Sequence, residues 1–242
     1  MNKNFQIKIS LQPLWGLKLF TFFICSFFIL EARIISEQNI SYPKIKIAPD
    51  FEVRIVASDP IVKYPMMACL DDLGRLYVAE SDGRNLTTRA AIERELPRFV
   101  RQLVDVDGDG VFDKSTIFAD RMTMPEGGVW YEGALYIIAA PYLWRLEDLD
   151  GDGVADKRDK ILGTMEFDGR ANQHGPYLGP NGRLYFSGGH FGYDLIGIDG
   201  TRSGFSRAAG VFSCWPDGSD VQVEGQGGVN PVDIVFTSNG DM

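Results

Sequence analysis

The chain has two histidines, His174 and His190, and both fall in the stretch Asn172–Gly192. Between them the segment Gly179–Gly182 reads Gly-Pro-Asn-Gly, which is typical of a tight turn because Pro fits its opening and Asn-Gly adopts positive φ at little cost. Strands on either side of such a turn run back together, so we expect both imidazoles at the open end of one β-hairpin. Imidazole is well suited to proton transfer near neutral pH, so this end is a candidate acid/base site, with a purely structural histidine pair as the alternative.

Two acidic loops share one pattern, since Asp105–Asp113 and Asp148–Asp156 both read Asp-x-Asp-Gly-Asp-Gly-x-x-Asp. Oxygen ligands so spaced around a Gly at the sharp bend are typical of a calcium loop. An EF-hand would place Glu at its last ligand position, where these loops have Thr116 and Asp159. We therefore expect weak structural Ca²⁺ binding, and a metal-free Asp/Gly hairpin is the alternative. The predicted ligands are Asp105, Asp107, Asp109, Asp113, Asp148, Asp150, Asp152 and Asp156.

The elements that must position these residues recur along the chain at intervals of about 50 to 60 residues. Each copy contains an apolar segment, a Gly-containing turn and a strand that begins with Leu-Tyr, at Leu76, Leu135 and Leu184, and then an outer pair of strands. A fourth copy begins at Asn230, and the one weak helical pattern is Thr88–Leu96. The pattern predicts an all-β fold, a β-propeller of four-stranded blades, with a generic antiparallel sandwich as the alternative.

Roughly three and a half blades do not close a ring, because propellers have about four to eight. We therefore expect residues 51–242 to form a partial β-propeller whose sequence stops inside a repeat. The alternating segment Phe51–Ala57 is predicted to be an outer strand that completes the last blade.

The order of strands in a blade also predicts which motifs share a face. His174 opens an inner strand and His190 follows a second strand, so both belong on one face, with His174 nearest the axis. The acidic loops belong on the opposite face. Long loops at a channel mouth commonly hold ligands. The polar side chains expected at this mouth are Arg84, Asn85, Arg121, Glu126, Arg170, Asn172, Asp194 and Asn230.

The N-terminal residues 1–32 have the pattern of an export signal. Lysines precede any acidic residue, and Leu19–Leu30 is an apolar run too short to span a bilayer comfortably. A retained signal anchor is the alternative, and it would provide the expected membrane contact. Residues 33–50 are a polar lead-in. Either alternative places the rest of the chain outside the cytoplasm, in the periplasm or at the cell surface.

The bulk composition narrows the class of partner. A net charge of −9 and a pI near 4.8, without a Lys/Arg cluster, argue against nucleic acid and favour neutral small molecules or other proteins. Cys69 and Cys214 could form one long-range disulfide in an oxidising compartment, or remain two buried thiols.

Several stretches together resemble a known family: Phe51–Pro60, Gly74–Glu80, the twin acidic loops and His174–Gly182. They resemble the N-terminal propeller of the membrane-bound dehydrogenases of planctomycetes and verrucomicrobia. Those proteins are similar in turn to the glucose/sorbosone dehydrogenases, which use pyrroloquinoline quinone (PQQ). The resemblance covers residues 50–242. It implies a propeller of about six blades, often followed by helical repeats and a c-type cytochrome domain that accepts electrons, with the haem outside this sequence.

The resemblance also implies a reaction. In the sugar dehydrogenases a histidine just before a Gly-Pro-Asp-Gly-like turn is the general base, and His174 matches its order along the chain, although the gap to the turn is shorter here. The family's cofactor-binding Arg and Lys positions find no match. The leading hypothesis is an exported oxidoreductase that oxidises a carbohydrate or alcohol hydroxyl with a quinone-type cofactor, with His174 as base. Around it, His190, Arg84, Asn172, Arg170 and Asn230 are the residues expected on the substrate and cofactor face.

Two alternatives from other functional classes remain open. One is a non-catalytic propeller that binds a glycan or a protein partner on the same face. The other is a lyase that uses the histidines for acid/base chemistry without a redox cofactor. Whether the chain is an enzyme is left open, because a fold hosts many functions and function must be argued from a site.

Overall fold

The computed structural model describes residues 46–168 and 173–242, and all its strands lie in the unit Asp50–Met242. Thirteen strands and one short α-helix make this described part nearly all-β. A search of the described residues finds no helix long and apolar enough to cross a membrane. The predicted signal, residues 1–32, lies outside the described residues.

Three antiparallel sheets follow one another along the chain and match the three predicted repeats. Blade 1 consists of β1 (Pro65–Leu70), β2 (Leu76–Ser81), β3 (Arg98–Val104) and β4 (Lys114–Met122). Blade 2 consists of β5 (Pro125–Tyr131), β6 (Ala134–Ala139), β7 (Tyr142–Glu147) and β8 (Lys157–Met165). Blade 3 consists of β9 (His174–Leu178), β10 (Leu184–Gly188), β12 (Ala209–Cys214) and β13 (Gln222–Gly228). The four-stranded blades are therefore confirmed.

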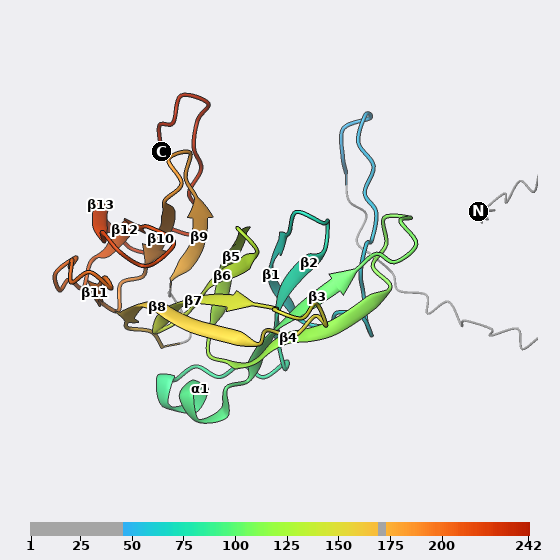
Figure 1. The fold of residues 1–242 in the computed structure, drawn as a ribbon, viewed down its shortest axis with the longest axis horizontal. Coiled ribbons are helices and arrows are strands. Elements are labelled where there is room, and N and C mark those ends of the chain that lie inside the picture. Colours follow the sequence, from blue (N-terminus) through green and yellow to red (C-terminus); the bar gives the residue numbers. More distant parts are fainter. Residues whose placement is uncertain (1–45, 169–172) are drawn as a thin grey trace, which may run out of the picture. The chain divides into compact units, whose positions relative to one another are not determined.

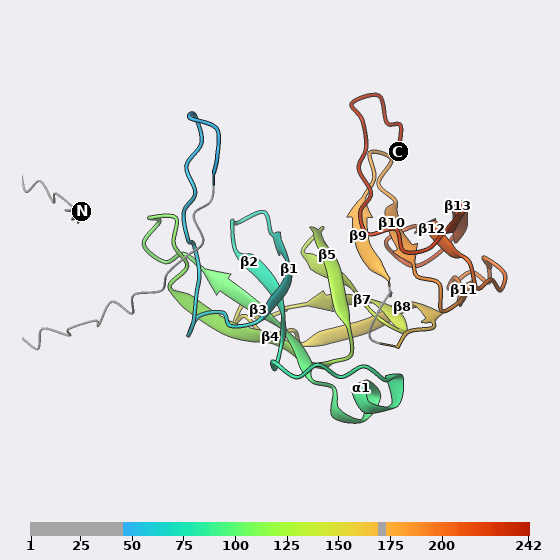
Figure 2. The same ribbon diagram turned by 180° about the vertical axis from the view of Figure 1, so that it is seen from behind.

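The first strands of the three blades are neighbours in space, since β5 contacts both β1 and β9. Figures 1 and 2 show the blades side by side, with these three strands on the same side of the array. Inner strands that meet while each sheet extends outward are the arrangement of a propeller and not of two stacked sheets. The generic sandwich is thereby rejected.

The inner strand β6 of the middle blade is apolar on both of its faces. Leu135 and Ile137 of β6 pack into the cluster shared with blade 1, whereas Tyr136 and Ile138 pack into the cluster shared with blade 3. Successive side chains of a strand point to opposite faces, and both faces of β6 are covered by a neighbouring blade. All six residues of β6 are therefore buried.

Two short elements interrupt the regular plan. The helix α1 (Arg89–Glu95) confirms the weak helical pattern, and the Thr88 side chain caps it by accepting from the Ala91 N–H. The strand β11 (Tyr193–Ile196) comes from the long connection after β10 and pairs with β8 as a fifth strand of blade 2. This fifth strand was not predicted.

The predicted strand Phe51–Ala57 is wrong as a regular strand, because no described strand pairs with it. Its predicted place as an outer strand is nevertheless supported by an equivalent contact in the next blade. The Phe112 N–H donates to Val56 O at 2.8 Å, and the Ala155 N–H donates to Phe118 O of β4 at 2.8 Å. Phe112 and Ala155 are equivalent positions of the twin acidic loops. Val56 therefore occupies, beside blade 1, the position that β4 occupies beside blade 2.

The start of a fourth repeat is visible in one turn. The Thr237 N–H donates to Asp241 O at 2.8 Å, as the Gly179 N–H donates to Arg183 O at 2.8 Å in blade 3. The turn of the fourth copy therefore exists, although no strand accompanies it among the described residues. The cysteines are free thiols on separate sheets, in β1 and β12, which favours the second of the two alternatives.

Candidate functional site

The edge of the array at which β1, β5 and β9 begin is here called the histidine edge. His174 is the first residue of β9 and lies on this edge with α1, while both acidic loops follow β3 and β7 at the opposite edge (Figures 1 and 2). The predicted division of the two motifs between opposite faces is therefore confirmed by the order of the strands.

Two glycines let the inner strands β5 and β9 approach each other closely at His174. A Cβ on Gly127 would lie 2.4 Å from Gly175 O, a distance that side-chain atoms do not reach. Gly127 and Gly175 both have positive φ, 157° and 103°, which glycine adopts without a steric penalty. The close approach brings the backbone of Glu126 against the His174 imidazole.

The His174 imidazole is half-buried and incompletely paired. Its Nε2 atom is buried and has no hydrogen-bond partner. Burial lowers its pKa below the ordinary value of 6.5, and the neighbouring Glu126 backbone and Asn230 side chain oppose this only in part. At neutral pH the ring is therefore uncharged and can accept a proton.

The segment Asn230–Asp233, which opens the fourth repeat, is held against blade 3. The buried Ser187 hydroxyl donates to Pro231 O at 2.6 Å, and the Tyr177 hydroxyl donates to Val232 O at 2.9 Å. These two bonds fix the segment beside His174, so that the Asn230 amide contacts the imidazole.

Buried polar atoms without a partner gather at the histidine edge. Arg98 begins β3, Gln173 directly precedes β9, His174 begins β9, and Asn230 follows β13. The unpaired buried atoms of these residues are Arg98 Nε, Gln173 Oε1, His174 Nε2 and Asn230 Oδ1. Buried polar groups are nearly always paired in folded proteins, so such a gathering marks a place that water or a ligand completes.

A groove of about 560 Å³ opens beside His174 and is here called the inner groove. Its walls come from β1, β5, β9 and the segment after Asn230. Its lining consists of Met66, Met67, Ala68, Glu126, Gly127, Gly128, His174, Tyr177, Val232 and Asp233. The volume is in the range of small-molecule sites in proteins.

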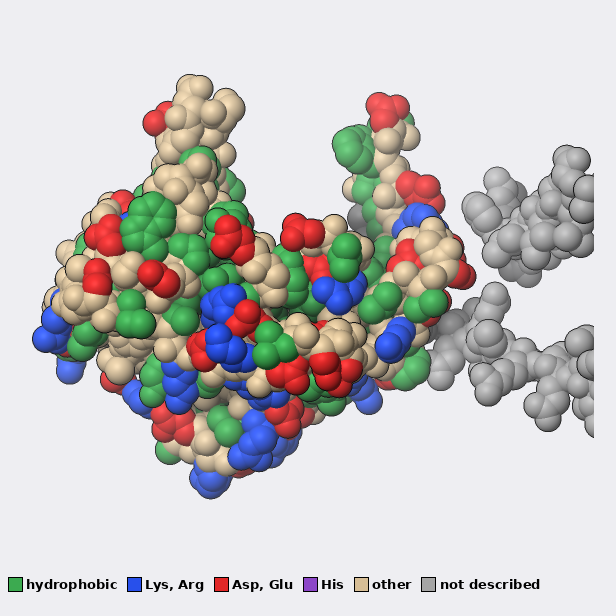
Figure 3. Space-filling view, viewed as in Figure 1, with side chains coloured by type: hydrophobic (Ala, Val, Ile, Leu, Met, Phe, Trp, Pro, Cys, Tyr) green, Lys and Arg blue, Asp and Glu red, His purple; other side chains and the backbone are tan. Residues whose placement is uncertain are grey.

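The structure brings together His174, Asn230 and Glu126 of the predicted mouth, but not the others. His190 is exposed and its ring lies against Phe191, and no described contact joins it to His174. Arg84 pairs with Asp82 and Glu95 at the end of α1, where Figure 3 shows acidic and basic side chains gathered. Arg170 and Asn172 lie outside the described residues.

The remaining predicted residues of the mouth lie outside the inner groove. Asp194 pairs with Arg202, and Asn85 and Arg121 are exposed. Tyr177 and Asp233 are the titratable groups of the groove that sequence reasoning missed. Asp233 lies at the start of the fourth repeat. Because that repeat could be recognised in the sequence from its turn, it could have indicated that Asp233 lies near the inner strands.

The two acidic loops share the same backbone hydrogen bonds to their first aspartate, but the third carboxylate of the cluster differs between them. Both carboxylate oxygens of Asp105 accept backbone N–H groups, from Gly108 and Gly110 at 2.8 Å each. Asp148 accepts from the corresponding glycines of the second loop at 2.8 and 2.9 Å. In each loop three carboxylates offer oxygen atoms within 4.8 Å of one another, namely Asp105, Asp107 and Asp109, and Asp148, Asp150 and Asp156.

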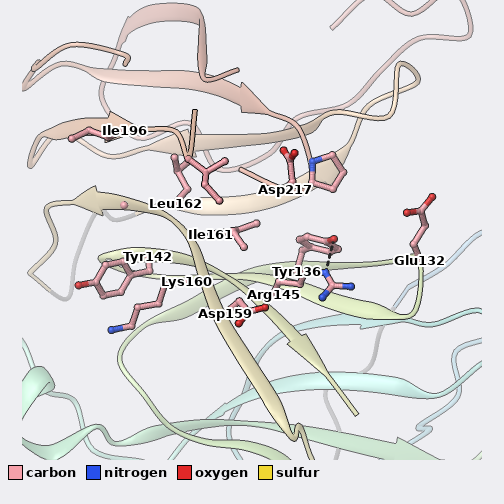
Figure 4. A pocket seen from close by; sticks show the side chains of 13 residues that line it. Glu132, Tyr136, Tyr142, Arg145, Asp159, Lys160, Ile161, Leu162, Ile196 and Asp217 are labelled. Atoms are coloured by element: carbon pink, nitrogen blue, oxygen red, sulfur yellow. Dashed lines mark hydrogen bonds between the residues drawn. The ribbon is translucent and has the colours of Figure 1, made fainter. Parts of the chain in front are cut away.

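A larger groove of about 800 Å³ lies between blade 2 and the connections of blade 3, lined by β8, β11 and the turn at Pro216 and Asp217 (Figure 4). Arg145 dominates its polar wall, but its guanidinium already donates to the Tyr136 hydroxyl at 2.9 Å and pairs with Glu147. None of the predicted site residues lines this groove. Of the two grooves, only the smaller inner groove is lined by one of the two histidines, His174.

Comparisons with known proteins identify the domain but not its activity. A family described as a domain of unknown function, DUF7133, matches residues 37–242. No curated protein matches the chain significantly. A solved structure of a luciferin-regenerating enzyme is similar, with 12% identity, a TM-score of 0.36, and coverage of 69% of this chain and 64% of that one. The chain thus spans less than two thirds of that structure.

Proposed function

The chain belongs to the DUF7133 family, a domain of unknown function. Because the family description gives no activity, we propose a function from the residues of the site. The inner groove binds a neutral carbohydrate or other polyol, and His174 takes the proton from one of its hydroxyls. This is the proton half of the oxidation carried out by sugar dehydrogenases.

One observation carries the proposal: the buried, unpaired Nε2 of an uncharged His174 beside a groove of ligand size. A general base must be neutral and must have its accepting nitrogen available. The contact of the ring with the Glu126 backbone holds the imidazole, and the Asn230 amide lies against the same ring. The hydroxyl proton passes to the imidazole, and in an oxidation the carbinol hydride leaves to an electron acceptor.

The described lining of the inner groove does not fit PQQ. That cofactor is a tricarboxylate, and carboxylates are held by Arg and Lys. The groove has the carboxylates of Glu126 and Asp233 and, among its described residues, neither Arg nor Lys. We therefore assign no step to this cofactor and assign only the base and the polyol to this groove.

The same base could serve a cofactor-free lyase, and one assay separates the two reactions. The purified chain is incubated with neutral aldoses and polyols, with and without an artificial electron-accepting dye. Dye reduction supports the oxidation, whereas an unsaturated product formed without dye supports elimination. Absence of any turnover contradicts the enzymatic proposal and leaves binding as the function. In the proposed physiological reaction a two-electron acceptor of the quinone class takes the hydride, and a c-type cytochrome domain or partner then takes its electrons one at a time.

The pH profile provides a prediction for His174. Because burial lowers the pKa of this base, kcat/KM should fall on the acid side with a midpoint below 6.5. Between the folded-state pKa and 6.5 the unfolded chain binds more protons, so stability should also decrease as the pH falls through this window. Rates and melting temperatures measured across pH 4 to 8 test both, and a midpoint above 6.5 would contradict the assignment.

We also propose that the acidic loops bind structural Ca²⁺. Carboxylate oxygens in flexible loops are the ligands that Ca²⁺ prefers, and each loop gathers three of them. A ligand that binds the folded state alone raises its stability. Saturating Ca²⁺ should therefore raise the melting temperature by about 2–4 °C for each kcal/mol of binding energy, and chelator should reverse the rise. The double variant Asp107→Asn, Asp150→Asn should lose the response; an equal response in this variant would remove the assignment.

Export to the periplasm or cell surface is proposed from residues 1–32 alone. The proposal depends on the basic residues and the apolar run Leu19–Leu30. Processing of the tagged chain in a secreting host tests it, because a cleaved signal and a retained anchor give products of different mass.

A further inference from the structure

Asp233 lines the inner groove, and its carboxylate is hydrogen-bonded to the backbone that follows it. One oxygen, Oδ1, accepts the backbone N–H of Ile234 at 2.8 Å. The residue is exposed to the groove, and its segment is held by the Ser187 and Tyr177 bonds to the backbone. The carboxylate is therefore held in place before any ligand arrives.

The Tyr177 hydroxyl stands beside this carboxylate. Burial raises the pKa of Tyr177 to about 12, and the charge of Asp233 adds to the effect. The phenol therefore keeps its proton throughout the physiological range. Because its single proton is donated to Val232 O, the Tyr177 oxygen can accept a hydrogen bond from a ligand hydroxyl, beside the stronger acceptor of the Asp233 carboxylate.

Another part of the lining of the groove is apolar. The residues of β1 that provide it are Met66, Met67 and Ala68. Val232, which directly precedes Asp233, is a further apolar residue of the lining. A sugar ring has an apolar C–H face and a rim of hydroxyls, so it matches a surface that is apolar in one part and carries a carboxylate in another. A flexible Met pair also adapts to rings of different shape.

We propose that Asp233 and Tyr177 form a polyol-binding subsite, in which the Asp233 carboxylate accepts hydrogen bonds from neighbouring hydroxyls of a neutral sugar. This subsite makes the proposed function more specific, and it depends on the proposed function only for the choice of the inner groove. The Asp233 charge repels a ligand that is itself anionic. The subsite therefore selects neutral sugars over sugars that carry a carboxylate.

Glucose and glucuronate make a matched pair of probes, because glucuronate replaces the terminal carbinol of glucose by a carboxylate. Binding to the full chain is measured by calorimetry at low ionic strength, with sorbitol and glycerol as further neutral polyols. We expect a neutral probe to bind, and glucuronate to bind at least about tenfold more weakly than glucose.

Two variants and one control complete the test. Asp233→Asn should weaken glucose binding by roughly tenfold, the size expected for a charged hydrogen bond, and should narrow the preference over glucuronate. Asp241→Asn, in the turn of the same segment but outside the groove, should change neither affinity. Tyr177→Phe should weaken glucose binding by a smaller factor.

His174→Gln separates this proposal from the proposed reaction, because it should reduce turnover by about 10²- to 10⁴-fold and retain the preference for glucose over glucuronate. If no neutral probe binds, if glucuronate binds as tightly as glucose, or if Asp233→Asn binds glucose as the parent does, the subsite is overturned. If binding follows the prediction while His174→Gln leaves turnover unchanged, the reaction fails and the subsite stands.

Discussion

Replacing His174 by Gln should reduce turnover by about 10²- to 10⁴-fold, the contribution usual for a general base. Gln keeps a polar side chain of similar reach but has no nitrogen that accepts a proton near neutral pH. Because Nε2 of His174 has no hydrogen-bond partner to lose and the Gln amide keeps an N–H donor for the Glu126 backbone, the substitution should cost little stability. The melting temperature should therefore stay close to that of the parent while kcat falls.

His190→Gln is the matched control for this variant. His190 is the only other histidine of the chain, and it is exposed against Phe191. It lies outside the inner groove, so its replacement should leave both turnover and stability unchanged. Equal losses in the two variants would contradict the assignment of the base to His174.

Replacing Gly127 by Ala should be the most damaging single methyl addition in the chain's inner strands. The new Cβ would lie 2.4 Å from Gly175 O and 2.5 Å from Gly175 N, both of which are backbone atoms of β9. Overpacking costs about 1–3 kcal/mol where neighbours can shift, and backbone at this distance must move as a whole. We expect a loss of at least this size in urea unfolding, together with loss of sugar binding as β5 and β9 separate.

Gly133→Ala is the control for this substitution. Gly133 lies in the turn after β5 and also has positive φ, 78°, but a Cβ there would meet nothing within 4 Å. It should cost only the roughly 1–2 kcal/mol of a left-handed conformation and leave the inner groove intact. A Gly127→Ala protein as stable as Gly133→Ala would show that the close contact of β5 with β9 is not formed.

The repeats and the blades were predictable from local chemistry. Leu76 and Leu184 open their strands, and Leu135 is the second residue of its strand, in each case after a Gly turn that is encoded by its own few residues. The order of strands in a blade then determined that His174 lies at the edge opposite the acidic loops. The turns and the repeats depend on residues that are close together in the sequence, so the sequence was sufficient to predict them.

The composition of the site depends on contacts between repeats, and there the sequence was less informative. Asp233 reaches the groove because Ser187 and Tyr177 hold the next repeat against blade 3. Arg84 was expected at the mouth but pairs with Glu95, an acidic neighbour supplied by the packing of α1. His190 follows β10 by a turn that directs it to solvent. The Ser187 and Tyr177 bonds join residues 44 and 55 positions apart, and Arg84 meets Glu95 only once α1 has folded, so a pattern of residue types does not encode these contacts.

The conformation of Phe51–Ala57 also depends on contacts that its own residues do not determine. Its alternation correctly indicated an outer-strand position, and the Val56 contact with Phe112 reproduces the contact of β4 with the second acidic loop. Regular strand structure requires a hydrogen-bonded neighbour, and the described residues provide none. The residue pattern therefore indicated the position of this segment, while its conformation depends on a partner.

The central claim is that the inner groove binds a neutral polyol against His174. The two imidazoles can be followed separately by NMR of histidine-labelled chain, since His174 and His190 are the only histidines. Titration with the best-binding neutral sugar should shift the His174 ring signals to saturation, with the affinity found by calorimetry, and leave those of His190 unmoved. A His174 signal that stays unchanged at saturating sugar, or a shift confined to His190, would contradict the account.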